Sequence, residues 1–113
     1  MIKASCHYGN VQLQFEQLPE SLTRCNCSIC RRYAASWIYF QQDEVQIICK
    51  QPTKAYIWGD KEIAFHHCEN CGCVTHYSSL PNKSHTRTAV NANLLPVSTI
   101  QDLKVRTFAG AAM

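Results

Sequence analysis

Two groups of cysteines constrain this chain more than any other feature of its sequence. Residues 25–30 read Cys-Asn-Cys-Ser-Ile-Cys, and residues 68–73 read Cys-Glu-Asn-Cys-Gly-Cys. The three thiols of the first group, Cys25, Cys27 and Cys30, are close enough in sequence to bind one ion. A zinc ion with three protein ligands keeps its fourth position free for chemistry. The chain is therefore a candidate metalloenzyme, with these three cysteines as its catalytic zinc ligands.

The length of 113 residues is that of one domain. We expect a single zinc-binding domain over residues 1–108 and a frayed tail over residues 109–113, because Ala-Gly-Ala-Ala-Met offers nothing large to pack. Eight cysteines are well above ordinary usage in a chain of this size. Metals or cross-links are therefore expected to supplement a small core.

The cysteines are read as metal ligands because the start of the chain does not resemble a secretory leader. Met-Ile-Lys-Ala-Ser-Cys lacks the apolar stretch and the cleavage site of a signal peptide. No apolar run is long enough to span a bilayer. We expect a cytoplasmic protein without membrane association, in which reduced thiols bind metal or take part in catalysis. A disulfide-rich secreted domain that has lost its leader is the alternative.

The charge of the chain argues against nucleic acid as a partner. Eleven Lys and Arg residues against eight Asp and Glu residues give a net charge of +3. The basic residues are scattered along the sequence, whereas nucleic-acid binding favours a concentrated basic stripe. A mildly positive surface is compatible with small anionic ligands. The sequence leaves the oligomeric state open.

Most of the predicted elements are strands. Residues 11–15 alternate apolar and polar side chains, which predicts a strand with one buried face. We expect a hairpin that delivers its second strand into the second cysteine group, with a turn at Gly59-Asp60-Lys61. Ser98 and Gln101 fit a capping box and predict a short helix. The remaining predicted strands are residues 37–40, 45–49, 55–58, 63–67, 74–77, 86–90 and 104–108.

The second cysteine group is expected to hold a structural ion. Cys68-x-x-Cys71 followed by Gly72 has the spacing of a zinc knuckle, in which the glycine lets the backbone turn beneath the metal. Cys6 is the obvious further ligand. Such a site can contribute on the order of 10 kcal/mol to the folding of a small domain. The alternative is that these thiols are reduced and free of metal.

Two further cysteines have less defined roles. Cys49 is in phase with Val45 and Ile47 on an alternating strand, so we expect it to be a small buried hydrophobic residue. Cys73 either completes a metal site or packs in the core.

Nearby histidines and arginines are candidates for supporting roles. His66 and His67 point to opposite faces of a strand, so at most one can face the metal. His76 could line a pocket or hydrogen bond to a ligand. Arg31 and Arg32 follow the first group directly, and either could pair with a ligand carboxylate. A solvated basic pair is an equally good interpretation.

Three blocks of residues, in order and at suitable spacing, resemble the glutathione-dependent formaldehyde-activating enzyme family, which also includes the centromere protein V domain. The blocks are residues 5–11, 25–32 and 65–72, and residues 90–95 also resemble a family segment. The resemblance implies a mainly β fold, a β-tent of coiled antiparallel sheets with zinc-binding cysteine clusters and at most one short helix. It also implies two zinc ions. Cys25, Cys27 and Cys30 would hold the catalytic ion, and Cys6, Cys68 and Cys71 the structural one.

The chain departs from the family pattern at position 8. The family usually has Cys-x-Cys-Gly here, whereas this chain has Cys-His-Tyr-Gly. Tyr8 is a poor replacement ligand because a phenol is seldom ionised at neutral pH. The fourth position could be taken by Cys73, the first choice as a thiolate, or by water, or the site could be weakened or empty. The histidine candidates for the same position are His7, His66 and His67.

The resemblance implies a carbon–sulfur lyase that reversibly joins glutathione and formaldehyde to S-hydroxymethylglutathione. Arg31, Arg32 or Arg87 could bind the carboxylates of a small-molecule thiol such as glutathione. The alternative from another class is a non-catalytic zinc module that binds a protein partner or nucleic acid. An open zinc position facing a pocket would favour the enzyme. A fourth protein ligand or a flat surface would favour the binding module.

Overall fold

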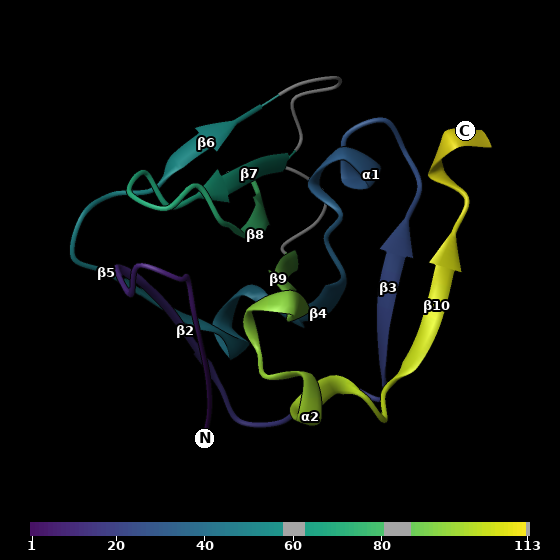
Figure 1. The fold of residues 1–113 in the computed structure, drawn as a ribbon, viewed down its shortest axis with the longest axis horizontal. Helices are drawn as coiled ribbons and strands as arrows, with labels where there is room; N and C mark the ends of the chain where they lie inside the picture. Colours follow the sequence, from purple (N-terminus) through teal and green to yellow (C-terminus); the bar gives the residue numbers. More distant parts are fainter. Residues whose placement is uncertain (58–62, 81–86, 113) are drawn as a thin grey trace.

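The computed structural model describes residues 1–57, 63–80 and 87–112, and two β-sheets form the framework of this part of the chain. Among these residues, the smaller sheet has the strand order β1-β2-β5 and the larger one β10-β3-β4-β9-β8-β7-β6 (Figure 1). Neighbouring strands are antiparallel except β10 and β3, which are parallel. The strands are β1 (Ile2–Ser5), β2 (Val11–Phe15), β3 (Ser21–Cys25), β4 (Trp37–Gln41), β5 (Gln46–Cys49), β6 (Lys54–Tyr56), β7 (Ile63–His67), β8 (Val74–Ser79), β9 (Arg87–Asn91) and β10 (Lys104–Phe108).

The mainly β fold predicted from the sequence is confirmed. Alternation in β2 buries Val11, Leu13 and Phe15, while Gln12 faces outward. The expected hairpin forms from β6 and β7, which pair Lys54 with His67. Its predicted turn, residues 59–61, lies outside the described residues, as does Thr86 at the start of a predicted strand.

The described residues contain two α-helices, α1 (Cys30–Tyr33) and α2 (Val97–Ile100), one more than expected. α1 is a single turn that closes the first cysteine loop, and Ala34, with a φ of 53°, ends it in the left-handed region. α2 is the predicted helix, but it begins after Pro96, and no side chain caps it. The predicted capping box is therefore wrong. The 3₁₀ turns are η1 (Gln42–Glu44), η2 (Ala92–Leu94) and η3 (Gly110–Ala112).

Strand β4 divides the core into two clusters, because successive side chains of a strand point to opposite faces. Ile38 and Phe40 pack in the larger cluster with the buried side chains of the small sheet. Trp37 packs in the smaller cluster with Phe65, and Tyr39 lies against it. The larger cluster contains Cys6 and Cys68, whereas the smaller one contains Cys30 with Cys25 and Cys27 against it. Each core cluster thus holds one of the cysteine groups.

Cys49 was expected to be buried, and the structure corrects this. It is exposed, as are the other residues of β5, because β5 is an edge of the three-stranded sheet. Alternation alone does not show that a strand face is covered. Val45, just before the strand, is buried as expected.

The tail over residues 109–113 was expected to fray, and this stays a prediction, although Gly110 and Ala111 lie close to the first cysteine loop. Phe108 is the register partner of Cys25 in the parallel β10–β3 pair, which brings the end of the chain to this loop. The backbone N–H of Asn26 donates to the carbonyl of Phe108 at 3.1 Å, and its side-chain Oδ1 accepts from the N–H of Ala111 at 3.0 Å. Figure 1 shows the C-terminus at the same end of the molecule as α1.

No helix among the described residues has the length and apolar character needed to cross a membrane.

Candidate metal centres

The first cysteine triad, Cys25, Cys27 and Cys30, comes together where β3 runs into α1. All three Sγ atoms lie within 4.8 Å of one another. The backbone N–H of Cys30 donates to the Sγ of Cys27 at 3.4 Å, which fixes the turn between them. Four sulfurs around a tetrahedral zinc, with bonds of about 2.3 Å, would be about 3.8 Å apart. The three thiols therefore fit a zinc ion with little rearrangement.

A cavity of about 740 Å³ opens beside this triad. Five aromatic side chains form part of its walls, and they can shield a reacting group from water. Its lining also carries two cationic side chains, Arg87 and Arg106. The lining includes the three cysteines and the aromatic residues Trp37, Tyr39, Phe65, Tyr77 and Phe108.

The three thiols differ in acidity. Burial raises the pKa of Cys30, and burial likewise raises that of Cys25. Burial would also raise the pKa of Cys27, but hydrogen bonds from the backbone N–H and the thiol of Cys30 outweigh it, so the pKa of Cys27 is lowered. Cys27 is therefore the thiol of this triad that deprotonates most readily, and thiolates are what zinc binds.

The indole of Trp37 supports the presence of an anion at this site. Its Nε1 is buried and makes no hydrogen bond among the described residues. It lies close enough to the Cys30 sulfur to oppose the effect of burial on the pKa of that thiol. A buried donor without a partner calls for an explanation, and a metal-bound thiolate would accept from it better than a neutral thiol.

Arg87 and Arg106 are the arginines of the cavity. The guanidinium of Arg87 lies over the ring of Tyr39, with its Cζ 4.6 Å from the ring centre. Both side chains are exposed, and neither forms an ion pair with a residue that the structure describes. Their charges are therefore available to an anionic ligand.

The other two candidate arginines lie outside this cavity. Arg32 donates from Nη1 to the carbonyl of Ser28 at 2.7 Å, and Arg31 lines a smaller pocket beside Ala34 and Asn93. Arg106 was not proposed from the sequence as a ligand-binding residue. Its place depends on the parallel pairing of β10 with β3, for which no local sequence signal exists.

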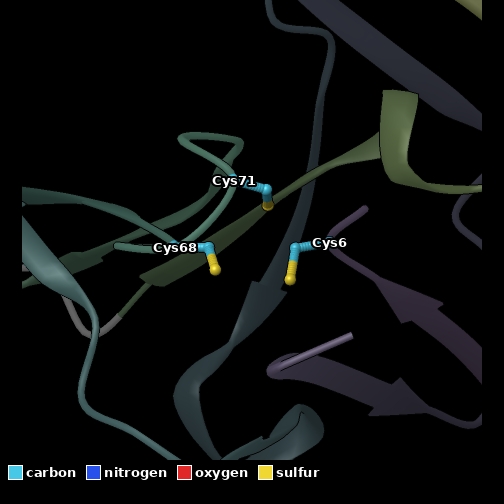
Figure 2. Close-up of side chains that lie close together, drawn as sticks. All are labelled: Cys6, Cys68 and Cys71. Carbon is cyan, nitrogen blue, oxygen red and sulfur yellow. The ribbon is translucent and has the colours of Figure 1, made fainter. Parts of the chain in front are cut away.

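The second triad, Cys6, Cys68 and Cys71, joins two turns that are far apart in the sequence. Figure 2 shows the three side chains close together, and their Sγ atoms lie within 4.8 Å of one another. Cys6 follows β1, whereas Cys68 and Cys71 lie in the turn between β7 and β8. This turn has the knuckle geometry predicted from the sequence, because Gly72 has a φ of 76° and its N–H donates to the Cys68 carbonyl at 2.8 Å.

The second triad is enclosed by the larger core cluster. Cys6 is 3% exposed and Cys68 is fully buried. The backbone N–H of Val11 donates to the Cys6 sulfur at 3.3 Å. Burial would raise the pKa of Cys71, but hydrogen bonds, first from the backbone N–H groups of Cys73 and Tyr8, lower it to about 6. Donors from both turns thus converge on these sulfurs, as they do around metal-bound thiolates.

The histidines of β7 and β8 do not line the cavity of the first triad. His66 and His76 are stacked, with ring centres 4.4 Å apart. Both ring nitrogens of His66 are within hydrogen-bond distance of hydroxyl groups, at 2.8 Å from Thr53 and 3.2 Å from Ser78. Burial lowers the pKa of His76 to about 3 and also lowers that of His66. The two rings are therefore a neutral structural pair at neutral pH.

Comparisons with known proteins agree with this architecture. No curated protein matches the chain. Among solved structures, the crystal structure of a Rhodobacter sphaeroides protein superposes with a TM-score of 0.75 at 23% sequence identity, covering 92% of this chain and 99% of that chain. This similarity shows a shared fold. The family described as "Glutathione-dependent formaldehyde-activating enzyme" matches residues 1–107. This match spans nearly the whole chain and includes both cysteine triads, so the protein belongs to the glutathione-dependent formaldehyde-activating enzyme family.

Proposed function

We propose that this protein is a zinc-dependent enzyme of the carbon–sulfur lyase type that acts on a thiol adduct. The reaction we assign is the reversible formation of S-hydroxymethylglutathione from glutathione and formaldehyde. The observation that carries this proposal is the cavity of about 740 Å³ that borders Cys25, Cys27 and Cys30. A purely structural zinc site has no need of such a cavity, whereas a catalytic one needs room for a substrate.

Cys25, Cys27 and Cys30 would hold the catalytic zinc through their sulfurs. When bound, zinc supplies a positive charge that lowers the pKa of a substrate thiol and so favours the nucleophilic thiolate. The structural ion would be held by the second triad, Cys6, Cys68 and Cys71.

The cavity suits an anionic thiol of the size of a small peptide. Arg87 and Arg106 can each form charge-assisted hydrogen bonds with a carboxylate, and glutathione carries two carboxylates. Binding of the carboxylates would hold the thiol near the cysteine triad. The reacting groups would then not have to meet by diffusion, which lowers the entropic part of the barrier. The Arg87 guanidinium, held over Tyr39, is oriented before the ligand arrives.

The chemistry requires one new bond and one proton transfer. The substrate sulfur bonds to the carbonyl carbon of formaldehyde, the π electrons of the carbonyl move to its oxygen, and that oxygen takes a proton. The thiol proton is the proton gained overall, so the addition balances. Tyr77 lines the cavity, and burial raises its pKa, which keeps its hydroxyl protonated. This hydroxyl can donate a hydrogen bond to the developing oxyanion.

The test is the equilibration of glutathione with formaldehyde, followed by exchange NMR with the zinc-loaded protein. We expect faster equilibration than in buffer, and loss of this acceleration together with one zinc ion in Cys27→Ser. Cys49→Ser is the matched control, because Cys49 is exposed and belongs to neither triad. Zinc-loaded wild-type protein that accelerates nothing would refute this substrate pair and leave the non-catalytic zinc module as the better explanation.

A further inference from the structure

The second triad takes its ligands from both sheets. Cys6 follows β1 of the smaller sheet, whereas Cys68 and Cys71 lie in the turn between β7 and β8 of the larger one. Ligands that are already held in place bind a metal more tightly, because less conformational freedom is lost on binding. The contacts that set the distance between these two turns therefore bear directly on how well the site keeps its ion.

Gln51 connects the two turns through hydrogen bonds. It lies in residues 50–53, the segment that crosses from β5 in the smaller sheet to β6 in the larger one (Figure 1). The side chain of Asn10 forms two hydrogen bonds with the backbone of Gln51, because its Oδ1 accepts from the N–H at 2.8 Å and its Nδ2 donates to the carbonyl at 3.0 Å. The side-chain Oε1 of Gln51 accepts from the Nδ2 of Asn70 at 2.8 Å. We refer to Asn10, Gln51 and Asn70 as the polar bridge.

Each end of the polar bridge belongs to a turn that carries metal ligands. Asn10 is 4% exposed and directly precedes Val11, whose N–H donates to the Cys6 sulfur at 3.3 Å. The backbone carbonyl of Asn10 also accepts from the N–H of Lys50 at 3.3 Å. At the other end, Asn70 lies between the two cysteines of the knuckle. The polar bridge thus links one turn to the other without using a sulfur.

A neighbouring ion pair offers a matched comparison. Lys54, at the start of β6, places its Nζ 3.5 Å from the Oε1 of Glu69 in the knuckle turn, and the two side chains are 62% and 56% exposed. Exposed ion pairs contribute little, because water and salt screen them. The hydrogen bonds of Asn10 are instead partly buried. We therefore expect the polar bridge, and not the ion pair, to hold the two turns together.

We propose that the polar bridge positions the two turns of the second triad and so slows the loss of zinc from this site. Asn10, Gln51 and Asn70 are positioning residues, since they act through the turns and not as ligands. They keep the Cys6 sulfur at a high effective concentration beside the knuckle, so a broken zinc–sulfur bond re-forms before the ion leaves. This inference rests on the zinc assigned above to the second triad and is independent of the proposed reaction.

The test is the rate of zinc release to a chromogenic chelator from the Cys27→Ser protein, in which the second triad is the complete one that remains. Asn10→Ala removes two partly buried hydrogen bonds and should speed release by roughly 10-fold or more. Gln51→Ala removes only the exposed hydrogen bond to the knuckle and should speed release by roughly 2- to 5-fold. Lys54→Met is the control and should leave the rate unchanged.

Three further measurements make the test specific for positioning. Gln51→Ala combined with Asn70→Ala should release zinc no faster than either alone, because both remove the same hydrogen bond. Gln51→Glu keeps an oxygen acceptor for Asn70 and should retain slow release. In the chain that keeps Cys27, the additional release step belongs to the first triad, and Asn10→Ala should leave its rate unchanged. A general loss of stability would speed both steps.

Unchanged release from the second site in both Asn10→Ala and Gln51→Ala would overturn the proposal. Equal acceleration of release from the two sites would overturn it as well. Zinc bound by Cys27→Ser shows that the second site is filled, whereas a protein of this kind that binds no zinc would overturn both the metal assignment and the role of the polar bridge. Should Asn10→Ala fail to fold, the exposed positions Gln51 and Asn70 decide the same question.

Discussion

The two cysteine triads present the same three donor atoms in different surroundings. The first borders a cavity of about 740 Å³, and its residues pack on the smaller, aromatic core cluster. The second lies in the larger core cluster, with Cys68 fully buried and Cys6 nearly so. A thiolate triad next to a cavity can offer an open metal position, whereas an enclosed one joins two parts of the chain. The two triads thus differ in their surrounding walls, although each presents three cysteine sulfurs.

The sheet explains how one small domain provides both surroundings. β4 sends Ile38 and Phe40 to one face and Trp37 and Tyr39 to the other. The first face is covered by the small sheet, which contributes Val11, Leu13 and Phe15 to the cluster that also contains Cys6 and Cys68. The other face is covered only in part, and the cavity remains there. Breaking each triad should therefore have a different consequence.

The largest expected effect is on folding, from Cys68→Ser. Loss of a structural zinc can remove on the order of 10 kcal/mol, as much as the whole stability of an ordinary domain. We expect this variant to lose cooperative thermal unfolding, followed by circular dichroism. Cys27→Ser is the matched change in the other triad and should keep the cooperative transition. Equal loss of structure in both variants would contradict the division of roles.

The next effect concerns substrate affinity at the cavity. Arg87→Met and Arg106→Met each remove a charge that can bind a carboxylate, and a hydrogen bond to a charged group contributes about 1.5–3 kcal/mol. Each variant should raise KM for glutathione by roughly 10-fold or more. Arg32→Met is the control, because the Arg32 guanidinium donates to the Ser28 carbonyl outside the cavity. A KM unchanged in both cavity variants would mean that the ligand lies elsewhere.

Acid should release the two ions in sequence. Zinc competes with protons for each thiolate, so a ligand with a raised pKa loses the metal at a higher pH. Burial raises the pKa of two thiols in the first triad, Cys25 and Cys30, but of one in the second, Cys6. Hydrogen bonds outweigh burial and lower the pKa of one thiol in each triad, that of Cys27 in the first and that of Cys71, to about 6, in the second. As the pH falls, we expect the first site to empty before the second. A chromogenic chelator measures the release in wild type and in Cys27→Ser, which should lack the first step.

Gly110→Ala in the tail should have a smaller effect, a reduced zinc affinity at the first site. A Cβ added at Gly110 would lie 2.7 Å from the Cys25 sulfur and 2.9 Å from the Cys27 Cβ, so the tail or the loop must shift. Overpacking of this kind costs about 1–3 kcal/mol. We expect weaker zinc binding at the first site with the second unchanged, measured by chelator competition.

Asn26→Ala tests the same contact without overpacking. It removes the acceptor for the Ala111 N–H, a hydrogen bond that contributes about 1 kcal/mol or less at an exposed position. The tail should loosen and zinc binding should change less than in Gly110→Ala. A larger effect on the second site than on the first in either variant would argue against a role of the tail at the first triad.

Local spacing predicted which cysteines within each loop lie close together. One short loop contains Cys25, Cys27 and Cys30, and one turn contains Cys68 and Cys71. The cysteines of each loop are close in sequence, so their spacing alone indicates that they are close in space. The strand over residues 11–15 was predicted for the same reason, because alternation reports one buried face directly.

Features that depend on distant segments could not be predicted in this way. Arg106 and Phe108 reach the cavity because β10 pairs with β3, and a parallel pairing of distant segments leaves no turn signal. Cys49 alternates like a buried residue but lies on an uncovered edge strand. Gly110 packs on the first triad only because β10 ends there. In each case the sequence does not reveal the tertiary contact between segments that are far apart in the chain.

The division of roles between the triads can be measured most directly by anomalous diffraction at the zinc edge from crystals of the zinc-loaded protein. The account predicts two ions per chain. The ion at Cys25, Cys27 and Cys30 should have three protein sulfurs and a fourth position that faces the cavity, and the ion at Cys6, Cys68 and Cys71 should be closed by protein ligands alone. A fourth protein ligand on the first ion would contradict the account. A single ion bound at neither triad would also contradict it.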